Sequence, residues 1–85
     1  MNQPLAGRFA ILADAGDNVA TLMDDRTGLD RLASGGPVAP GIPFGHKVAV
    51  APIAAGAAVI KYGHVIGHAT ADIPQGGHVH VHNCD

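Results

Sequence analysis

The chain lacks the residues that usually build helical or disulfide-stapled domains. All seven of its acidic residues are aspartates, and the absence of glutamate argues against long helices, where glutamate is common. The single cysteine, Cys84, excludes an internal disulfide framework and a structural zinc site made of thiolates. We therefore expect a reducing, cytoplasmic location.

Aromatic residues and long apolar runs are also scarce. The only aromatics are Phe9, Phe44 and Tyr62, so the core must consist mostly of alanine, valine, isoleucine and leucine. Such a core is thin for 85 residues, and we expect burial against another chain, with a homo-oligomer in isolation. The apolar run at residues 9–13 is too short for a signal-peptide core or a membrane span, so no membrane partner is expected.

Charge and motif content exclude several functions. The net charge is −2, and the five lysines and arginines form no basic stripe, so a nucleic-acid partner is not expected. The sequence contains no glycine-rich phosphate loop, nucleophile elbow, Cys-x-x-Cys pair or dinucleotide-binding signature.

What the chain does contain is a repeated spacing, Ile-x-x-Gly-x-x-Val, which starts at Ile42, Ile53 and Ile73. Each copy predicts a strand that ends at isoleucine, a turn in which glycine takes a positive φ, and a valine that returns to the core. Pro43 and Pro74 occupy the first turn position, which favours type I or II turns. The alternative is coincidence in a chain rich in alanine, glycine and valine.

These patterns predict one small all-β domain over residues 8–85, after a flexible tail at residues 1–7. The expected strands cover residues 8–13, 19–23, 47–51, 58–61, 65–69 and 78–82. Residues 24–36 are expected to form a loop or a single helical turn, and Tyr62-Gly63-His64 a tight hairpin turn.

Histidines follow two of the repeat turns. Alternation along residues 78–82 would place three imidazoles on one strand face, with Val79 and Val81 pointing to the core. Two of these imidazoles can converge on one cation, and a third ligand would come from His46, because its repeat unit matches the one that carries His78. The alternative is a hydrated polar face whose imidazoles are mostly neutral at pH 7.

The remaining polar candidates have ordinary structural interpretations. Lys47 is interpreted as a solvated charge after a turn. Lys61 is interpreted as a side chain whose apolar stem covers apolar surface, and Tyr62 as a ring packed at the hairpin corner. His64 and His68 are expected to be exposed, with no assigned role.

Three segments together resemble a known family. They are residues 42–49 (IPFGHKVA), 59–67 (VIKYGHVIG) and 71–83 (ADIPQGGHVHVHN). They are similar to the SAF domain, with a β-clip fold, that forms the small subunit or N-terminal domain of the altronate/galactarate dehydratase family. The first forty residues resemble this family only loosely.

The resemblance implies a role in sugar-acid dehydration. Enzymes of this family remove water from acids such as altronate or galactarate and depend on a divalent metal, usually Fe(II), with Mn or Zn possible. Related enzymes use the same small subunit to release sulfite from sulfolactate. The implied partners are a large catalytic subunit and a small sugar acid, and the chain alone is expected to be inactive.

The resemblance also assigns residues to roles. The implied metal ligands are His46, His80 and His82. The implied catalytic residues are His46, Lys47 and Tyr62, and those that bind substrate are Lys47, Lys61 and Asn83. The alternative for Asn83 is to cap a turn. The alternative for the whole chain is a non-catalytic SAF module that binds a carbohydrate or a protein.

Overall fold

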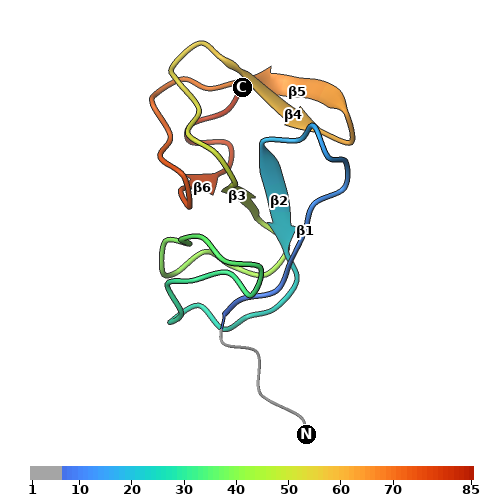
Figure 1. Cartoon of the computed structure of the whole chain (residues 1–85). Coiled ribbons are helices and arrows are strands. Elements are labelled where there is room, and N and C mark those ends of the chain that lie inside the picture. Colours follow the sequence, from blue (N-terminus) through green and yellow to red (C-terminus); the bar gives the residue numbers. More distant parts are fainter. Residues whose placement is uncertain (1–6) are drawn as a thin grey trace, which may run out of the picture.

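The computed structural model describes residues 7–85, which form strands, turns and loops (Figure 1). The strands are β1 (Ala10–Ile11), β2 (Val19–Leu22), β3 (Lys47–Ala49), β4 (Ala58–Lys61), β5 (His64–His68) and β6 (His78–Val79). The predicted all-β class is confirmed. Within the described part of the chain, no helix is long and apolar enough to cross a membrane. Of the tail predicted at residues 1–7, residues 1–6 lie outside the description, whereas Gly7 is buried.

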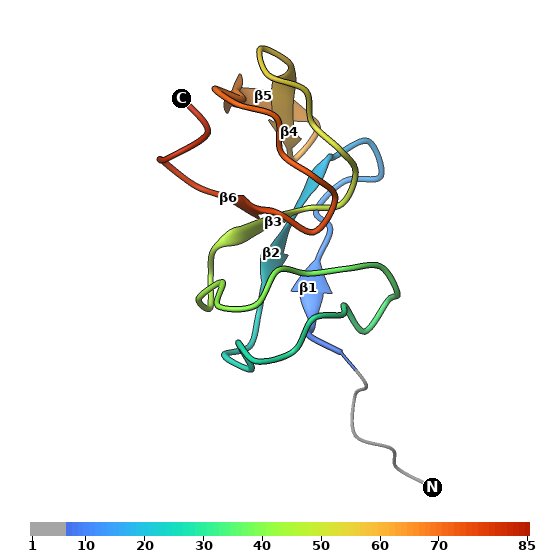
Figure 2. The same ribbon diagram turned by 90° about the vertical axis from the view of Figure 1, so that its left-hand side faces the viewer.

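The strands form two antiparallel sheets. The larger has the order β1-β2-β3-β6, and the smaller is the β4–β5 hairpin. The hairpin lies beyond one end of the larger sheet, and β3 and β6 run side by side at that sheet's edge (Figures 1 and 2). Two segments that are distant in sequence, around residues 46 and 79, are therefore neighbours.

The turns and buried residues predicted for the repeat are confirmed, but the strands predicted to end at its isoleucines are not: Ile42 lies in a loop, and Ile53 and Ile73 form only an isolated bridge. Its isoleucines are at most 3% exposed, its valines are fully buried, and its glycines have φ of 83–85°. In each turn the residue after glycine donates its N–H to the carbonyl two residues before glycine, as His46 does to Pro43. This is the geometry of a turn with a positive φ at its third residue.

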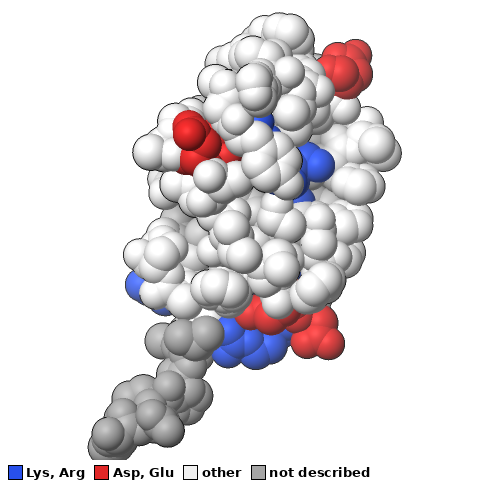
Figure 3. Space-filling model, turned by 90° about the vertical axis from the view of Figure 1, so that its right-hand side faces the viewer, with Lys and Arg blue, Asp and Glu red and all other residues white. Residues whose placement is uncertain are grey.

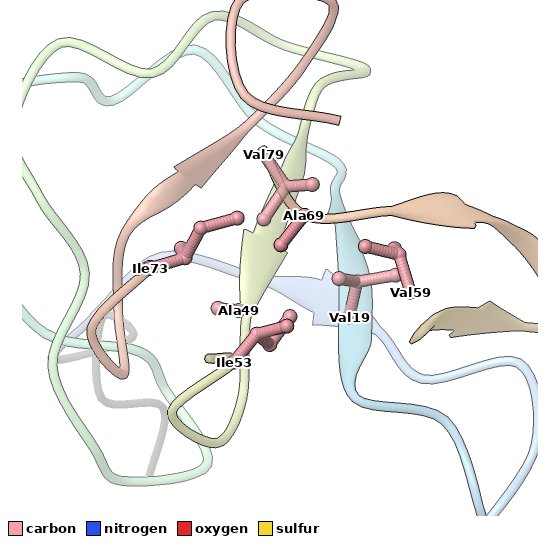
Figure 4. Close-up of a cluster of buried hydrophobic side chains, with 7 residues drawn as sticks. All are labelled: Val19, Ala49, Ile53, Val59, Ala69, Ile73 and Val79. Atoms are coloured by element: carbon pink, nitrogen blue, oxygen red, sulfur yellow. The ribbon is translucent and has the colours of Figure 1, made fainter. Parts of the chain in front are cut away.

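The two faces of the larger sheet bury different clusters. One face holds Val19, Ala49, Val59, Val79 and three neighbours, with Val59 of β4 beside Val19 of β2 (Figure 4). The other cluster consists of Ala20, Leu22, Leu32, Val38, Ile42 and Val48. Alternation along β3 therefore sends Lys47 and Ala49 to one face and His46 and Val48 to the other.

The strand predicted over residues 78–82 is wrong beyond Val79. The chain turns at residues 80–83, and the N–H groups of Asn83 and Cys84 both donate to the His80 carbonyl. Val81, predicted to face the core, is 83% exposed. Local hydrogen bonds of the asparagine have overridden the period-two pattern.

The strand predicted over residues 8–13 is also shorter than expected. Only Ala10–Ile11 pairs with β2, because Arg8 forms a parallel bridge to Leu32 and the chain turns after Ile11. The strands at residues 47–61 end within two residues of their predicted bounds, and residues 24–36 form loops with no helical turn.

The hairpin turn at Tyr62-Gly63 is confirmed. Tyr62 has φ of 58° and Gly63 has φ of 73°, as in a two-residue type I′ turn. The buried Asp17 carboxylate accepts the N–H groups of both residues, at 2.9 and 2.8 Å. This contact ties the hairpin to the β1–β2 connection.

Candidate imidazole site

Three histidines from two sequence-distant turns meet at one edge of the larger sheet. Nδ1 of His46 lies 2.9 Å from Nε2 of His78, and the ring of His46 stacks on that of His80 with centroids 4.1 Å apart. One nitrogen of each of the three rings lies within 4.8 Å of the others. All three side chains are partly buried. We call this group the imidazole site.

Strand register explains why these three side chains meet. Lys47 pairs with Val79 and Val48 with His78, so continuing the antiparallel register sets His46 opposite His80. Both His46 and His78 then share the sheet face that carries Val48. His46 comes from the turn at residues 43–46, and His78 and His80 come from β6 and the residues that follow it.

Asn83 holds the β6 side of the imidazole site. Its Oδ1 accepts the N–H of His80 at 3.0 Å, and its Nδ2 donates to the His78 carbonyl at 2.7 Å. Both ends of the amide therefore fix the backbone between two of the imidazoles. This matches the turn-capping interpretation, while a contact between Asn83 and substrate stays a prediction.

The environment of the site favours neutral imidazoles. Burial lowers the pKa of His78, and the neighbouring charges of His46, His82, His80 and Lys47 lower it further. The pKa of His80 is lowered by burial and then by His46, Lys47 and His82. A lowered pKa leaves nitrogen lone pairs free near neutral pH, which is the state that binds metal.

The nitrogen geometry fits a metal ion at the His46–His78 pair. Two nitrogens at about 2.0–2.1 Å from one ion are about 2.9 Å apart if the ion is octahedral and about 3.3–3.4 Å apart in a tetrahedral zinc site. The observed separation of 2.9 Å therefore matches octahedral coordination, and it also suits a hydrogen bond between one protonated and one unprotonated nitrogen. The rings of His80 and His46 stack with 16° between their planes, so their lone pairs lie in nearly parallel planes and the His80 ring must tilt to join the same ion.

The imidazole site coincides only in part with the metal ligands implied by the resemblance, His46, His80 and His82, which stay a prediction. His46 and His80 are in the imidazole site, but the third member is His78, which had no predicted role. The exposed His82 ring lies 5.0 Å from the His78 ring, beside the site. An antiparallel pairing of the strands that carry Val48 and Val79 would have identified His78, since it sets His78 opposite Val48.

Of the other predicted residues, Lys61 and Tyr62 lie away from the imidazole site, on the β4–β5 hairpin. Tyr62 is 63% exposed at the hairpin tip, with the Lys61 ammonium 4.7 Å from its ring centroid. Lys47 shares a sheet face with Val79 and not with the imidazoles, although its charge reaches His78 and His80. Among the described residues, no hydrogen bond or ring contact joins Tyr62 or Lys61 to the imidazole site.

Charged side chains form no continuous basic surface on the face drawn in Figure 3. Blue and red groups lie next to each other at its lower end. This agrees with the absence of a basic stripe in the sequence.

One buried ion pair near the site had no signal in the sequence. Arg8 is fully buried; its Nε lies 2.9 Å from an Asp24 carboxylate oxygen, and its guanidinium also donates to the Ile42 carbonyl. Burial alone would raise the pKa of Asp24, but hydrogen bonds from Phe9 and the arginines hold it well below its usual range. Arg8 thus anchors the start of the turn that carries His46.

The three histidines of the imidazole site are partly exposed. The hollow of about 260 Å³ found on the domain lies elsewhere, between β1, β2 and the loop at residues 34–37. Its lining includes Leu12, Leu32, Ser34 and Gln75 and contains no histidine.

Sequence comparison places this fold and site in a family. The model of the altronate/galactarate dehydratase SAF domain matches residues 8–85. The chain belongs to this family of SAF domains, as the resemblance of its motifs implied.

Its relatives include lyases of two kinds. The chain is 56% identical over 43 residues to the (2R)-sulfolactate sulfo-lyase subunit alpha of Paracoccus pantotrophus, covering 51% of this chain and 64% of that subunit. It is 64% identical over 39 residues to the altronate dehydratase of Escherichia coli K12, covering 46% of this chain and 8% of the enzyme. It is 41% identical over 70 residues to the altronate dehydratase of Bacillus subtilis 168, covering 79% of this chain and 14% of the enzyme. The match thus spans less than two thirds of each of these relatives.

Proposed function

We propose that this chain is the SAF component of a metal-dependent lyase that dehydrates a sugar acid such as altronate or galactarate. In this proposal it acts only together with a large catalytic part, either fused to it or supplied as a separate subunit. The observation that carries the proposal is the meeting of His46, His78 and His80 in one partly buried site.

The three imidazoles suit a divalent ion, with Fe(II) first and Mn or Zn as alternatives. Imidazole nitrogen is a good ligand for iron and zinc, and three ligands leave positions open for water or substrate oxygens. When bound, such an ion would stabilise the enolate-like charge that forms when the proton next to the carboxylate leaves.

The chain's own residues would hold and orient the reacting groups. Asn83 fixes the backbone of His78 and His80, so the imidazoles are already placed before substrate arrives. His82 lies beside His78 and is exposed, and an imidazole in this position is able to move a proton to or from a leaving hydroxyl. The roles predicted for Lys47, Lys61, Tyr62 and Asn83 with substrate remain part of the proposal.

A sulfo-lyase is the second candidate. The 56% identity to a subunit named for sulfolactate favours it. Both reactions remove a proton and a leaving group from adjacent carbons of a hydroxy acid, so the imidazole site serves either.

The test compares histidines inside and outside the site. We expect His78→Ala and His80→Ala to abolish turnover of altronate, galactarate or sulfolactate by the complete lyase and to remove metal binding measured by calorimetry. His64→Ala on the exposed hairpin is the matched control and should retain both. Because the His78 and His80 pKa values are lowered, metal affinity should persist below the ordinary histidine pKa of about 6.5 and fail only at more acidic pH.

Two outcomes would contradict the proposal. Equal activity of the wild type and the two site variants would exclude a role of the imidazoles in chemistry. A stable complex with no turnover on any of these acids would favour a binding module without catalysis.

A further inference from the structure

A large apolar side chain projects into solvent beside the imidazole site. Val81 is 83% exposed, more than any other large hydrophobic residue in the described part of the chain. Its turn is fixed, because two backbone N–H groups and the Asn83 side chain bind within residues 78–84. The exposure of Val81 is therefore built into the fold.

A second exposed apolar side chain lies in the turn that carries His46. Phe44 is 57% exposed, and the His46 N–H bonded to the Pro43 carbonyl closes the turn around it. Phe44 is one of only two phenylalanines in the chain, and the domain core would be larger if its ring were buried there. The fold instead presents it to solvent.

The two residues lie in the turns that carry the site, Phe44 two positions before His46 and Val81 one position after His80. The stacking of His46 on His80 brings their turns together, and Figure 2 shows the turn before β3 and the turn after β6 on the same side of the molecule. We call Phe44 and Val81 the apolar rim. Exposed apolar side chains next to partly buried polar groups give a docking partner apolar area to bury, and buried apolar side chains form the core of protein interfaces.

We infer that the apolar rim is the surface on which the large catalytic part of the lyase docks, closing the imidazole site. This inference rests on the proposed function, which supplies the partner. The matched segment makes up only 8% and 14% of the two altronate dehydratases, so in those relatives a much larger body accompanies it. The three imidazoles are only partly buried, and further burial by this body would strengthen their electrostatic interactions.

The chain offers matched controls for each rim residue. Phe9 is 47% exposed next to β1, and Val65 is 58% exposed on β5, both outside the two turns of the site. Serine substitutions at Phe44 and Val81 can thus be compared with the same substitutions at Phe9 and Val65. All four side chains are exposed, so little folding stability depends on them, and thermal melts would confirm that each variant is folded.

The experiment measures binding of each variant to the separately expressed large subunit or catalytic domain of the lyase, by calorimetry or surface plasmon resonance. Phe44→Ser and Val81→Ser should each weaken binding by about tenfold or more, because interface anchors typically lose that much when truncated. Phe9→Ser and Val65→Ser should change it by less than about threefold.

Several results would overturn the inference. They are no binding by the wild-type chain, equal losses in all four variants, or losses confined to Phe9 and Val65. Sedimentation that shows the wild-type chain self-associating through Val81, with partner binding unaffected, would assign the rim to a second copy instead. The activity of the complex distinguishes failure of the docking surface from failure of the proposed function. If the complex is active and Phe44→Ser and Val81→Ser do not weaken binding, only the docking surface is refuted. If the two variants weaken binding but the wild-type complex has no turnover, only the proposed chemistry is refuted.

Discussion

At the scale of single residues, a few polar side chains fix the backbone on which the rest depends. The Asp17 carboxylate accepts hydrogen bonds from the N–H groups of Tyr62, Gly63 and Asp14. The Asn83 side chain hydrogen-bonds to the His78 carbonyl and the His80 N–H. Burial would raise the pKa of Asp17, but these backbone hydrogen bonds outweigh it and hold the pKa below its ordinary value. The ionised form is therefore the one that stabilises the fold.

The substitution Asp17→Asn tests this at the hairpin. An amide has a single oxygen in place of the two that accept these bonds, so we expect a lower melting temperature at pH 7. Since the folded-state pKa lies below the unfolded one, the wild type's advantage should be complete above about pH 4 and disappear as pH falls through the folded-state pKa. Thermal melts from pH 7 to pH 2 measure it.

Asp30→Asn is the control, because Asp30 is exposed. It should leave the melting temperature unchanged at every pH. A difference between wild type and Asp17→Asn that grows as pH falls would contradict the assignment.

At the scale of elements, each copy of the repeat forms a turn that reverses the chain between two buried residues. Its isoleucine and valine are buried on either side of a turn that glycine completes at positive φ. The three copies end in the segments that carry His46, Val59 and His78. Two of them therefore deliver imidazoles to the same place, because β3 and β6 pair.

Replacing Gly56 by alanine should isolate the cost of this turn. No atom lies within 4 Å of an added Cβ, so the effect comes from φ of 83° alone. We expect a loss of about 1–2 kcal/mol in the free energy of unfolding. Chemical denaturation provides the measurement.

Gly28→Ala is the matched control for this turn. Its added Cβ would also meet nothing within 4 Å, and its φ is not in the positive region. It should be neutral or slightly stabilising, because alanine restricts the unfolded chain. Equal losses at both glycines would show that the turn imposes no conformational cost.

At the scale of the whole molecule, stability depends on a small core shared by both sheets. Ile53 is 2% exposed and bridges to Ile73, within the cluster that also contains Val59 of the hairpin. Losing packing here should release the hairpin from the larger sheet. A core of this size leaves little stability in reserve.

The substitution Ile53→Ala should therefore cost about 2–5 kcal/mol in the free energy of unfolding, close to the full stability of so small a domain. Ile66→Ala on β5, where the side chain is 44% exposed, should change it by less than about 0.5 kcal/mol. Urea unfolding followed by circular dichroism distinguishes the two. Similar effects of both variants would mean that the two sheets do not share this core.

The sequence by itself determined the all-β class, the three repeat turns and the hairpin at Tyr62-Gly63. These features follow from local rules, since glycine at positive φ and alternating valines act over a few residues. Its motifs also identified the family that the matching of residues 8–85 confirmed.

The sequence predicted that His46 meets imidazoles of residues 78–82, and the tertiary structure decided which of them it meets and which apolar side chains stay outside. The ring of His78 joins His46 because β3 and β6 pair, and Val81 leaves the core because the Asn83 side chain binds the His80 N–H and the His78 carbonyl and so turns the chain. Burial of Arg8 against Asp24 likewise depends on a contact across sixteen positions of the chain. Pairing between distant segments follows from the packing of the whole chain, which no local pattern encodes.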